Sequence, residues 1–217
     1  MNQNLISQVG QIGTGAAFIL FSLIFIFAFS GHPGLLQPRL LQPEGIIRRA
    51  RRIKLLQLAH SLVLLSTALL IVMTIHFMRI LAQGSAAWAG IIGAALAVVG
   101  AILLAADKGA LCLTMSALDT VPEDKFSAMM PGLLAMFSKK GWMVLLWGML
   151  LLPVGFAIQA VGLLQANPLP RWQSALFLIG VLFVGTPDGV EIINLSASIL
   201  MAIAMIPYGI HLVAMVF

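Results

Sequence analysis

Charged residues are scarce in this chain. Only 9% of its 217 residues are Asp, Glu, Lys or Arg, whereas 61% are apolar. A soluble domain carries charge on about a quarter of its residues and is about half apolar. The composition therefore excludes a soluble globular domain and a disordered chain, and it predicts an integral membrane protein.

Cysteine and catalytic motifs are also lacking. The single cysteine, Cys112, excludes an internal disulfide and any metal site built on paired cysteines. We find no His-Glu-x-x-His, no Gly-x-Ser-x-Gly, no phosphate-binding loop and no dinucleotide fingerprint. The sequence therefore favours a protein that is not an enzyme.

Six apolar stretches lie between the charged segments. They are continuous rather than alternating, which is typical of membrane helices and not of the strands of an outer-membrane barrel. We predict an all-α bundle of six transmembrane helices that form one polytopic domain over residues 1–217. The expected spans are 8–30, 55–80, 86–107, 141–165, 171–187 and 191–216, of which the fifth is the shortest.

Lys and Arg are distributed unevenly between the two ends of these spans. Ten of the twelve lie in the expected loops 31–54 and 108–140, and only Arg79 and Arg171 lie at the other end. Cytoplasmic loops carry the excess of positive charge. We therefore predict two cytoplasmic loops and both termini outside, most simply in a bacterial inner membrane. The pI near 10 then reflects topology, and we expect no nucleic-acid partner.

The second loop is expected to contain an amphipathic helix. Thr120-Val-Pro-Glu-Asp is a helix start, with a capping hydroxyl, an early proline and acids in the first turn. Apolar residues then recur along one helical face: Phe126, Met129, Met130, Leu133, Leu134 and Phe137.

Basic residues of the first loop form a dense cluster before the second span. Such clusters commonly fix topology, and they also suit a docking site for anionic lipid headgroups. The candidate headgroup ligands are Arg48, Arg49, Arg51, Arg52 and Lys54.

Histidines inside the spans could ligate a cofactor, or they could sit in the membrane interface or bond to neighbouring backbone. His76 and His211 are expected at similar depth near the outer ends of the second and sixth spans. Two histidines on facing helices can ligate a b-type haem. His60 and His76 lie 16 residues apart on one helix and so on nearly opposite faces, which argues against a second haem.

Four polar residues share a depth near the cytoplasmic end of the bundle: Gln57, His60, Glu191 and Asn194. They could line a small polar cavity or a proton entry. The alternative is a helix cap together with ordinary interhelical hydrogen bonds.

The third span is rich in small residues. Ala86, Gly90 and Ala94 share one face, and Gly93, Ala97 and Ala101 share the next. Small residues four apart allow helices to approach closely in lipid, so this span suits the bundle centre or self-association.

Three functions therefore remain open. The first is a non-catalytic accessory or scaffold subunit of a larger membrane complex, in contact with the lipid bilayer and with other membrane subunits. The second is a b-haem electron-transfer or quinol-reactive subunit. The third is a small transporter or channel.

Overall fold

The computed structural model describes residues 3–32, 35–36, 40, 42–137, 143–184 and 190–217. These residues contain no strand. They form eight α-helices, which are α1 (Gln3–Ser30), α2 (Pro43–Ala50), α3 (Lys54–Leu81), α4 (Ala87–Asp119), α5 (Glu123–Phe137), α6 (Met143–Ala166), α7 (Arg171–Phe183) and α8 (Glu191–Ala214).

Five of these helices, α1, α3, α4, α6 and α8, are long and apolar enough to cross a membrane. The all-helical prediction is therefore confirmed, and these helices support a multi-pass membrane protein. The fifth expected span, 171–187, is not confirmed, because its helix α7 has 13 residues and is about 20 Å long at 1.5 Å per residue. The hydrocarbon core of a bilayer is about 30 Å thick.

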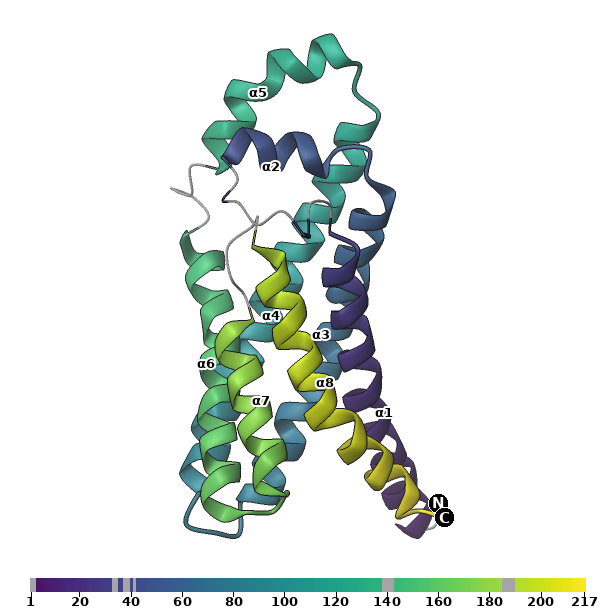
Figure 1. Ribbon diagram of the computed structural model, residues 1–217, viewed down its shortest axis with the longest axis vertical. Coiled ribbons are helices and arrows are strands. Elements are labelled where there is room, and N and C mark those ends of the chain that lie inside the picture. Colours follow the sequence, from purple (N-terminus) through teal and green to yellow (C-terminus); the bar gives the residue numbers. More distant parts are fainter. Residues whose placement is uncertain (1–2, 33–34, 37–39, 41, 138–142, 185–189) are drawn as a thin grey trace.

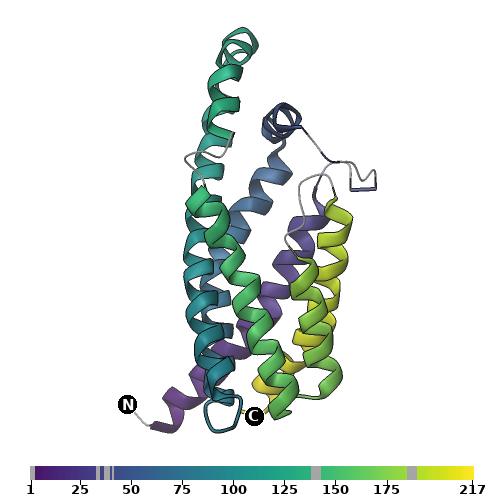
Figure 2. The same cartoon turned by 90° about the vertical axis from the view of Figure 1, so that its left-hand side faces the viewer.

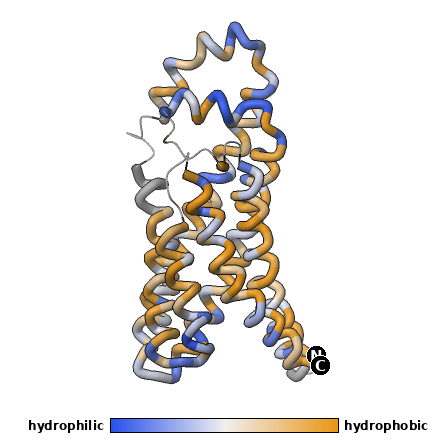
Figure 3. The backbone as a smooth tube through the Cα atoms, viewed as in Figure 1, coloured by the Kyte–Doolittle hydropathy of each residue, from blue (hydrophilic) through white to orange (hydrophobic). Residues whose placement is uncertain are grey.

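Both chain termini lie at the same end of the molecule, which we call the terminal end (Figure 1). Helices α2 and α5 lie beyond the opposite end of the bundle (Figures 1 and 2). Apolar residues dominate the length of the bundle between these ends, and hydrophilic residues gather at α2, α5 and the turns of the terminal end (Figure 3). This distribution is the one that a bilayer requires of a protein that crosses it.

Helix α4 is longer than a membrane is thick. Its 33 residues extend about 50 Å, and its first charged residues, Asp107 and Lys108, come about 30 Å from its start. If the bilayer boundary lies at these charges, residues 109–119 continue about 16 Å beyond it. We call these residues, with α2 and α5, the outer layer.

The outer layer has an apolar core of its own. Ile47 of α2, Leu118 of α4 and Phe126, Met130 and Leu133 of α5 are buried against one another. The expected apolar face of α5 is thus only partly buried. Met129, from the same sequence pattern, stays 44% exposed.

Five helices close a ring. Contacts run from α1 to α3, α3 to α6, α6 to α7, α7 to α8 and α8 back to α1. Helix α4 packs outside this ring, against α3 and α6. The ring therefore has an axis, and side chains from its five members face one another across it.

Small residues bring α4 and α6 into backbone contact. A Cβ atom added at Gly93 would lie 2.7 Å from the carbonyl oxygen of Gly155, and one added at Gly155 would lie 2.4 Å from the backbone nitrogen of Ala97. The small-residue faces predicted for the third span are accordingly buried inside the bundle. Self-association through this span stays a prediction.

A buried glutamine ties three helices together. Gln159 of α6 is fully buried and donates from Nε2 to the carbonyl oxygens of Thr74 in α3, at 2.9 Å, and Gly90 in α4, at 3.3 Å. Its Oε1 accepts from the Thr74 hydroxyl at 2.9 Å. Such bonds stabilise helix association in lipid, where no water competes for the groups.

Candidate functional site

Glu191 is a buried carboxylate at the start of α8, with 3% of its surface exposed. Its Oε1 lies 3.4 Å from Nδ1 of His32, just after α1, and 3.5 Å from Nη1 of Arg49 in α2. The carboxylate also lies at the positive end of the α8 dipole, which favours its charge. Buried charges need such partners, because an unpaired one is costly to remove from water.

His60 of α3 joins this group through His32. Their rings lie edge to face with centroids 5.7 Å apart. Lys108 of α4 lies within electrostatic range of His60, and its ammonium is paired with Asp107 at 3.2 Å. We call His32, Arg49, His60 and Glu191 the Glu191 cluster. It gathers side chains from four segments at the level of the first charges of α4.

The predicted polar cavity is therefore only partly assembled. His60 and Glu191 lie on either side of His32, and Asn194 is buried at 4% exposure one turn farther along α8. Gln57 belongs to a different group, which joins the start of α3 to the end of α4. A lining role for these four residues stays a prediction.

Gln57 contacts the end of α4 instead. Asp119 accepts hydrogen bonds at Oδ2 from Lys54 Nζ, at 2.5 Å, and from Gln57 Nε2, at 2.8 Å, and at Oδ1 from the backbone of Arg52, at 2.7 Å. These bonds, above all the one from Lys54, lower the pKa of Asp119 from 3.8 to about 2 because they stabilise its charged form. They fasten the start of α3 to the outer layer.

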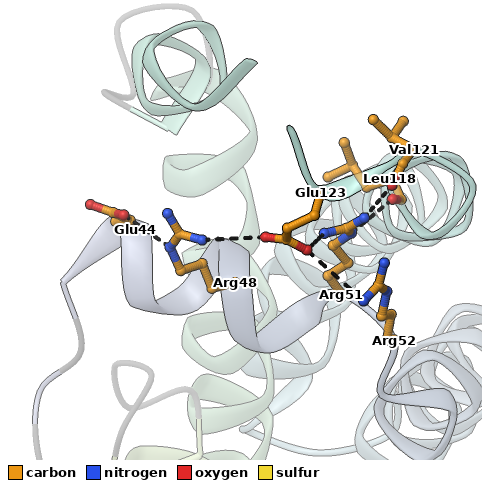
Figure 4. Close-up of polar contacts among 7 residues, drawn as sticks. All are labelled: Glu44, Arg48, Arg51, Arg52, Leu118, Val121 and Glu123. Atoms are coloured by element: carbon orange, nitrogen blue, oxygen red, sulfur yellow. Dashed lines mark hydrogen bonds and ion pairs between the residues drawn. The ribbon is translucent and has the colours of Figure 1, made fainter. Parts of the chain in front are cut away.

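Arg51 is the central contact of the outer layer (Figure 4). Its side chain is 4% exposed. Nε donates to the carbonyl oxygen of Leu118 at 3.1 Å, Nη1 donates to Glu123 at 2.5 Å, and Nη2 donates to the carbonyl oxygen of Val121. The guanidinium also lies 4.3 Å from the ring centre of Phe126, a distance at which cation–π attraction adds to the hydrogen bonds.

The arginines beside it complete a group that we call the Arg51 cluster: Arg48, Arg51, Arg52 and Glu123. Arg48 pairs with Glu44 at 2.9 Å, and both Arg48 and Arg52 lie 3.9 Å from the Glu123 carboxylate. These groups line an open pocket of about 170 Å³.

The predicted headgroup ligands thus all have acidic partners within the chain. Binding of lipid headgroups by them stays a prediction, and the buried Arg51 is the least accessible of the five. The pairs are Arg48 with Glu44, Arg49 with Glu191, Arg51 and Arg52 with Glu123, and Lys54 with Asp119.

His76 meets a tyrosine rather than the other histidine of the predicted haem pair. Its Nε2 lies 2.6 Å from the hydroxyl oxygen of Tyr208 in α8, and its ring lies 5.6 Å from that of Phe18. His211 follows Tyr208 by one turn and is exposed. This geometry does not favour the predicted haem ligation, which stays a prediction. Among the described residues, no group of three or more His, Cys, Asp or Glu side chains could hold a metal ion.

An apolar cavity of about 40 Å³ lies on the axis of the ring. Each ring helix contributes to its lining, through Phe25, Met73, Phe156, Phe177 and Met201 among others. We call it the axial cavity. Toward the terminal end, aromatic rings from all five helices follow in mutual contact: Phe18, Phe77, Phe156, Phe177 and Tyr208.

Sequence reasoning missed three residues of these groups. Gln159 could have been found, because a polar side chain inside a long apolar run usually bonds a neighbouring helix. His32 and Tyr208 gave no comparable signal. His32 looked like a loop residue before a proline, and its role depends on where α2 and α8 bring Arg49 and Glu191.

Searches against protein-family models, curated proteins and solved structures find no match for this chain. Its function must therefore be inferred from the residues themselves.

Proposed function

We propose that this chain is a non-catalytic multi-pass membrane protein that serves as an accessory or scaffold subunit of a larger membrane complex. The observation that carries the proposal is the buried Arg51. It bonds α2 to the end of α4 and to α5 at once, and so holds the outer layer in one position relative to the bundle. A fixed surface outside the lipid is what a subunit needs in order to position a partner.

The use of polar groups within the bundle also supports this proposal. Gln159 bonds α6 to α3 and α4, and His76 bonds α3 to Tyr208 of α8. Catalytic groups are generally placed to reach a substrate, whereas these side chains are engaged with one another.

Photo-crosslinking in native membranes tests the scaffold role. A photoreactive residue at Met129, 44% exposed on α5, is compared with one at Leu65, 71% exposed within the apolar length of α3. We expect Met129 to give a stoichiometric adduct with one defined membrane protein, and Arg51→Ala to abolish it. The same adducts at Leu65, or none at Met129, would overturn the proposal.

The proposal includes an orientation, with the outer layer in the cytoplasm and both termini outside. The excess of Lys and Arg at the outer-layer end supports it. In a Cys112→Ser background, Met129→Cys should react with a membrane-impermeant maleimide in inverted vesicles and not in intact cells. The reverse pattern would place both termini in the cytoplasm.

A small transporter or channel is the second candidate. The observation that favours it is the ion pair of the buried Glu191, at the start of α8, with Arg49 of α2. Flux of a tested solute in liposomes that is lost in Glu191→Gln would support transport. Flux that persists in this variant would argue against a role for the pair.

A further inference from the structure

Three guanidinium groups of the Arg51 cluster converge on one carboxylate (Figure 4). Arg51 donates from Nη1 to Glu123 at 2.5 Å, and the Nη1 atoms of Arg48 and Arg52 each lie 3.9 Å from the same carboxylate. The side chain of Glu123 is 61% exposed, so water can solvate its charge when it turns away from the arginines. An anionic group thus occupies the meeting point of three cations, and it is free to leave.

Arg51 keeps its position without Glu123. Its Nε donates to the carbonyl oxygen of Leu118 and its Nη2 to that of Val121, and its guanidinium lies against the ring of Phe126. The remaining nitrogen, Nη1, therefore faces the carboxylate from a fixed place. A donor that is already held in position binds an incoming anion without the entropy cost of ordering a free side chain.

The other two arginines have hydrogen-bonding capacity to spare. The side chain of Arg52 is 60% exposed, and within the described part of the chain its only acidic contact is the 3.9 Å approach to Glu123, which is longer than a hydrogen bond. Arg48 bonds Glu44 through Nε, but its Nη1 is equally far from Glu123. Guanidinium groups present N–H donors in a fork that matches the oxygens of a carboxylate or a phosphate. These donors suit an anion with more oxygen atoms than the carboxylate of Glu123.

The charge of the cluster suits a dianion. With Glu123 turned outward, its three arginines and the single carboxylate of Glu44 leave two positive charges without a partner. The nearby Lys54 and Asp119 neutralise each other, and the two residues that follow Glu123 carry opposite charges. A phosphate monoester carries close to two negative charges at pH 7 and has three acceptor oxygens, one for each guanidinium. The open pocket of about 170 Å³ has the room of about a dozen water-sized spheres, which is ample for a phosphate group.

The height of the pocket above the membrane indicates where this phosphate comes from. With the bilayer boundary at Asp107 and Lys108, Leu118, which Arg51 contacts, lies about 16 Å beyond it along α4. Helices α2 and α5 accordingly lie beyond the end of the bundle (Figures 1 and 2). The headgroup layer on each side of a bilayer is only about 5 to 8 Å thick. The phosphate of a phospholipid therefore stays below the pocket, whereas a dissolved molecule reaches it from the water.

We propose that the Arg51 cluster binds the phosphate monoester group of a soluble molecule, which displaces Glu123 from the three arginines. The site lies in the outer layer but requires no partner protein, so the purified chain tests it separately from the scaffold role.

Phosphorus NMR titration of the full chain in a phosphate-free detergent tests the site. The probe is methyl phosphate, a monoester, and the comparison probe is dimethyl phosphate, a diester with a single charge. Arg52→Gln removes one exposed guanidinium from the pocket. Lys125→Gln is the matched control, because it removes the same charge from an exposed position of α5 outside the pocket lining.

We expect the affinity for methyl phosphate to fall about fivefold or more in Arg52→Gln and by less than about twofold in Lys125→Gln. Glu123→Gln should raise it about twofold or more, because the competing charge is gone. An equal loss in Arg52→Gln and Lys125→Gln, or no saturable binding by the wild-type chain at millimolar concentration, would overturn the site. Dimethyl phosphate binding as tight as that of methyl phosphate would overturn the assignment of a dianion, and an unchanged affinity in Glu123→Gln would overturn the displacement.

Nanodiscs distinguish a soluble source of the phosphate from a lipid. Phosphatidic acid carries a phosphate monoester on a lipid, and phosphatidylglycerol provides an anionic surface of matched charge with a diester instead. We expect the two lipids to have the same effect on methyl phosphate binding. Stronger competition by phosphatidic acid would place the ligand in the membrane and overturn the soluble source.

Discussion

The contact between α4 and α6 can be tested at Gly100. A Cβ atom added there would lie 2.2 Å from the backbone nitrogen of Leu152 and 2.6 Å from its Cα. Non-bonded carbon atoms are most stable at about 3.5 Å or more, so Gly100→Ala must push the two helices apart by about 1 Å. Overpacking of this kind costs about 1 to 3 kcal/mol, and it exceeds the gain of up to about 1 kcal/mol from replacing glycine in a helix.

Gly109 provides the matched control on the same helix. Nothing lies within 4 Å of a Cβ atom added there, so Gly109→Ala should gain up to about 1 kcal/mol from helix propensity alone. For a chain of this size, 1 kcal/mol corresponds to about 2 to 4 °C in melting temperature. The overpacking cost of Gly100→Ala less its propensity gain is about 1 kcal/mol. We therefore expect thermal unfolding in detergent to show Gly100→Ala about 2 to 4 °C below the wild-type chain and Gly109→Ala about 2 to 4 °C above it.

A second variant separates backbone contact from side-chain crowding. Leu152→Ala removes the outer side-chain atoms and leaves the backbone nitrogen and Cα in place, so it should not rescue Gly100→Ala. Rescue by Leu152→Ala, or a Gly100→Ala melting temperature equal to or above that of the wild type, would refute the close approach of the two helices.

Three further predictions concern the polar ties. Gln159→Leu should lower the free energy of unfolding by about 1 to 3 kcal/mol, because Thr74 loses its buried hydrogen-bond partner. Unfolding in mixed micelles measures this free energy, and an unchanged value would contradict the prediction. Arg51→Ala should cost about 1 to 3 kcal/mol, because the carbonyl oxygens of Leu118 and Val121 lose their donor, and it should speed proteolysis near Glu123. A wild-type digestion rate would show that Arg51 does not hold α2 to α5. The pKa of Asp119 is lowered to about 2, so the ionised carboxylate stabilises the fold fully above its ordinary pKa near 4, and this stabilisation is lost as the pH falls toward 2. The melting temperatures at pH 5 and pH 2.5 should therefore differ less in Asp119→Asn than in wild type. An equal difference in both proteins would exclude this linkage.

The sequence by itself determined the all-helical class of this protein. Long apolar runs and few charges are local properties, so they predicted long apolar helices without any contact being known. The start of α5 after Thr120 could likewise be predicted from the sequence, because an early proline and acidic residues in the first turn favour a helix start through local interactions alone. The fifth expected span was the shortest, and its helix α7 has 13 residues, fewer than a crossing helix needs.

Only the tertiary structure decided which polar side chains meet. Glu191 and His60 were expected at one depth, but their connection through His32 and Arg49 depends on how α2 folds back over the bundle. Tyr208 rather than His211 contacts His76, because the lengthwise position and the rotation of α8 relative to α3 are set by packing against distant segments, and together they select which of the two side chains is reached. The depth of a residue in the membrane can be counted along the sequence. The rotation of each helix and the neighbours of its side chains are set only when all the helices pack together.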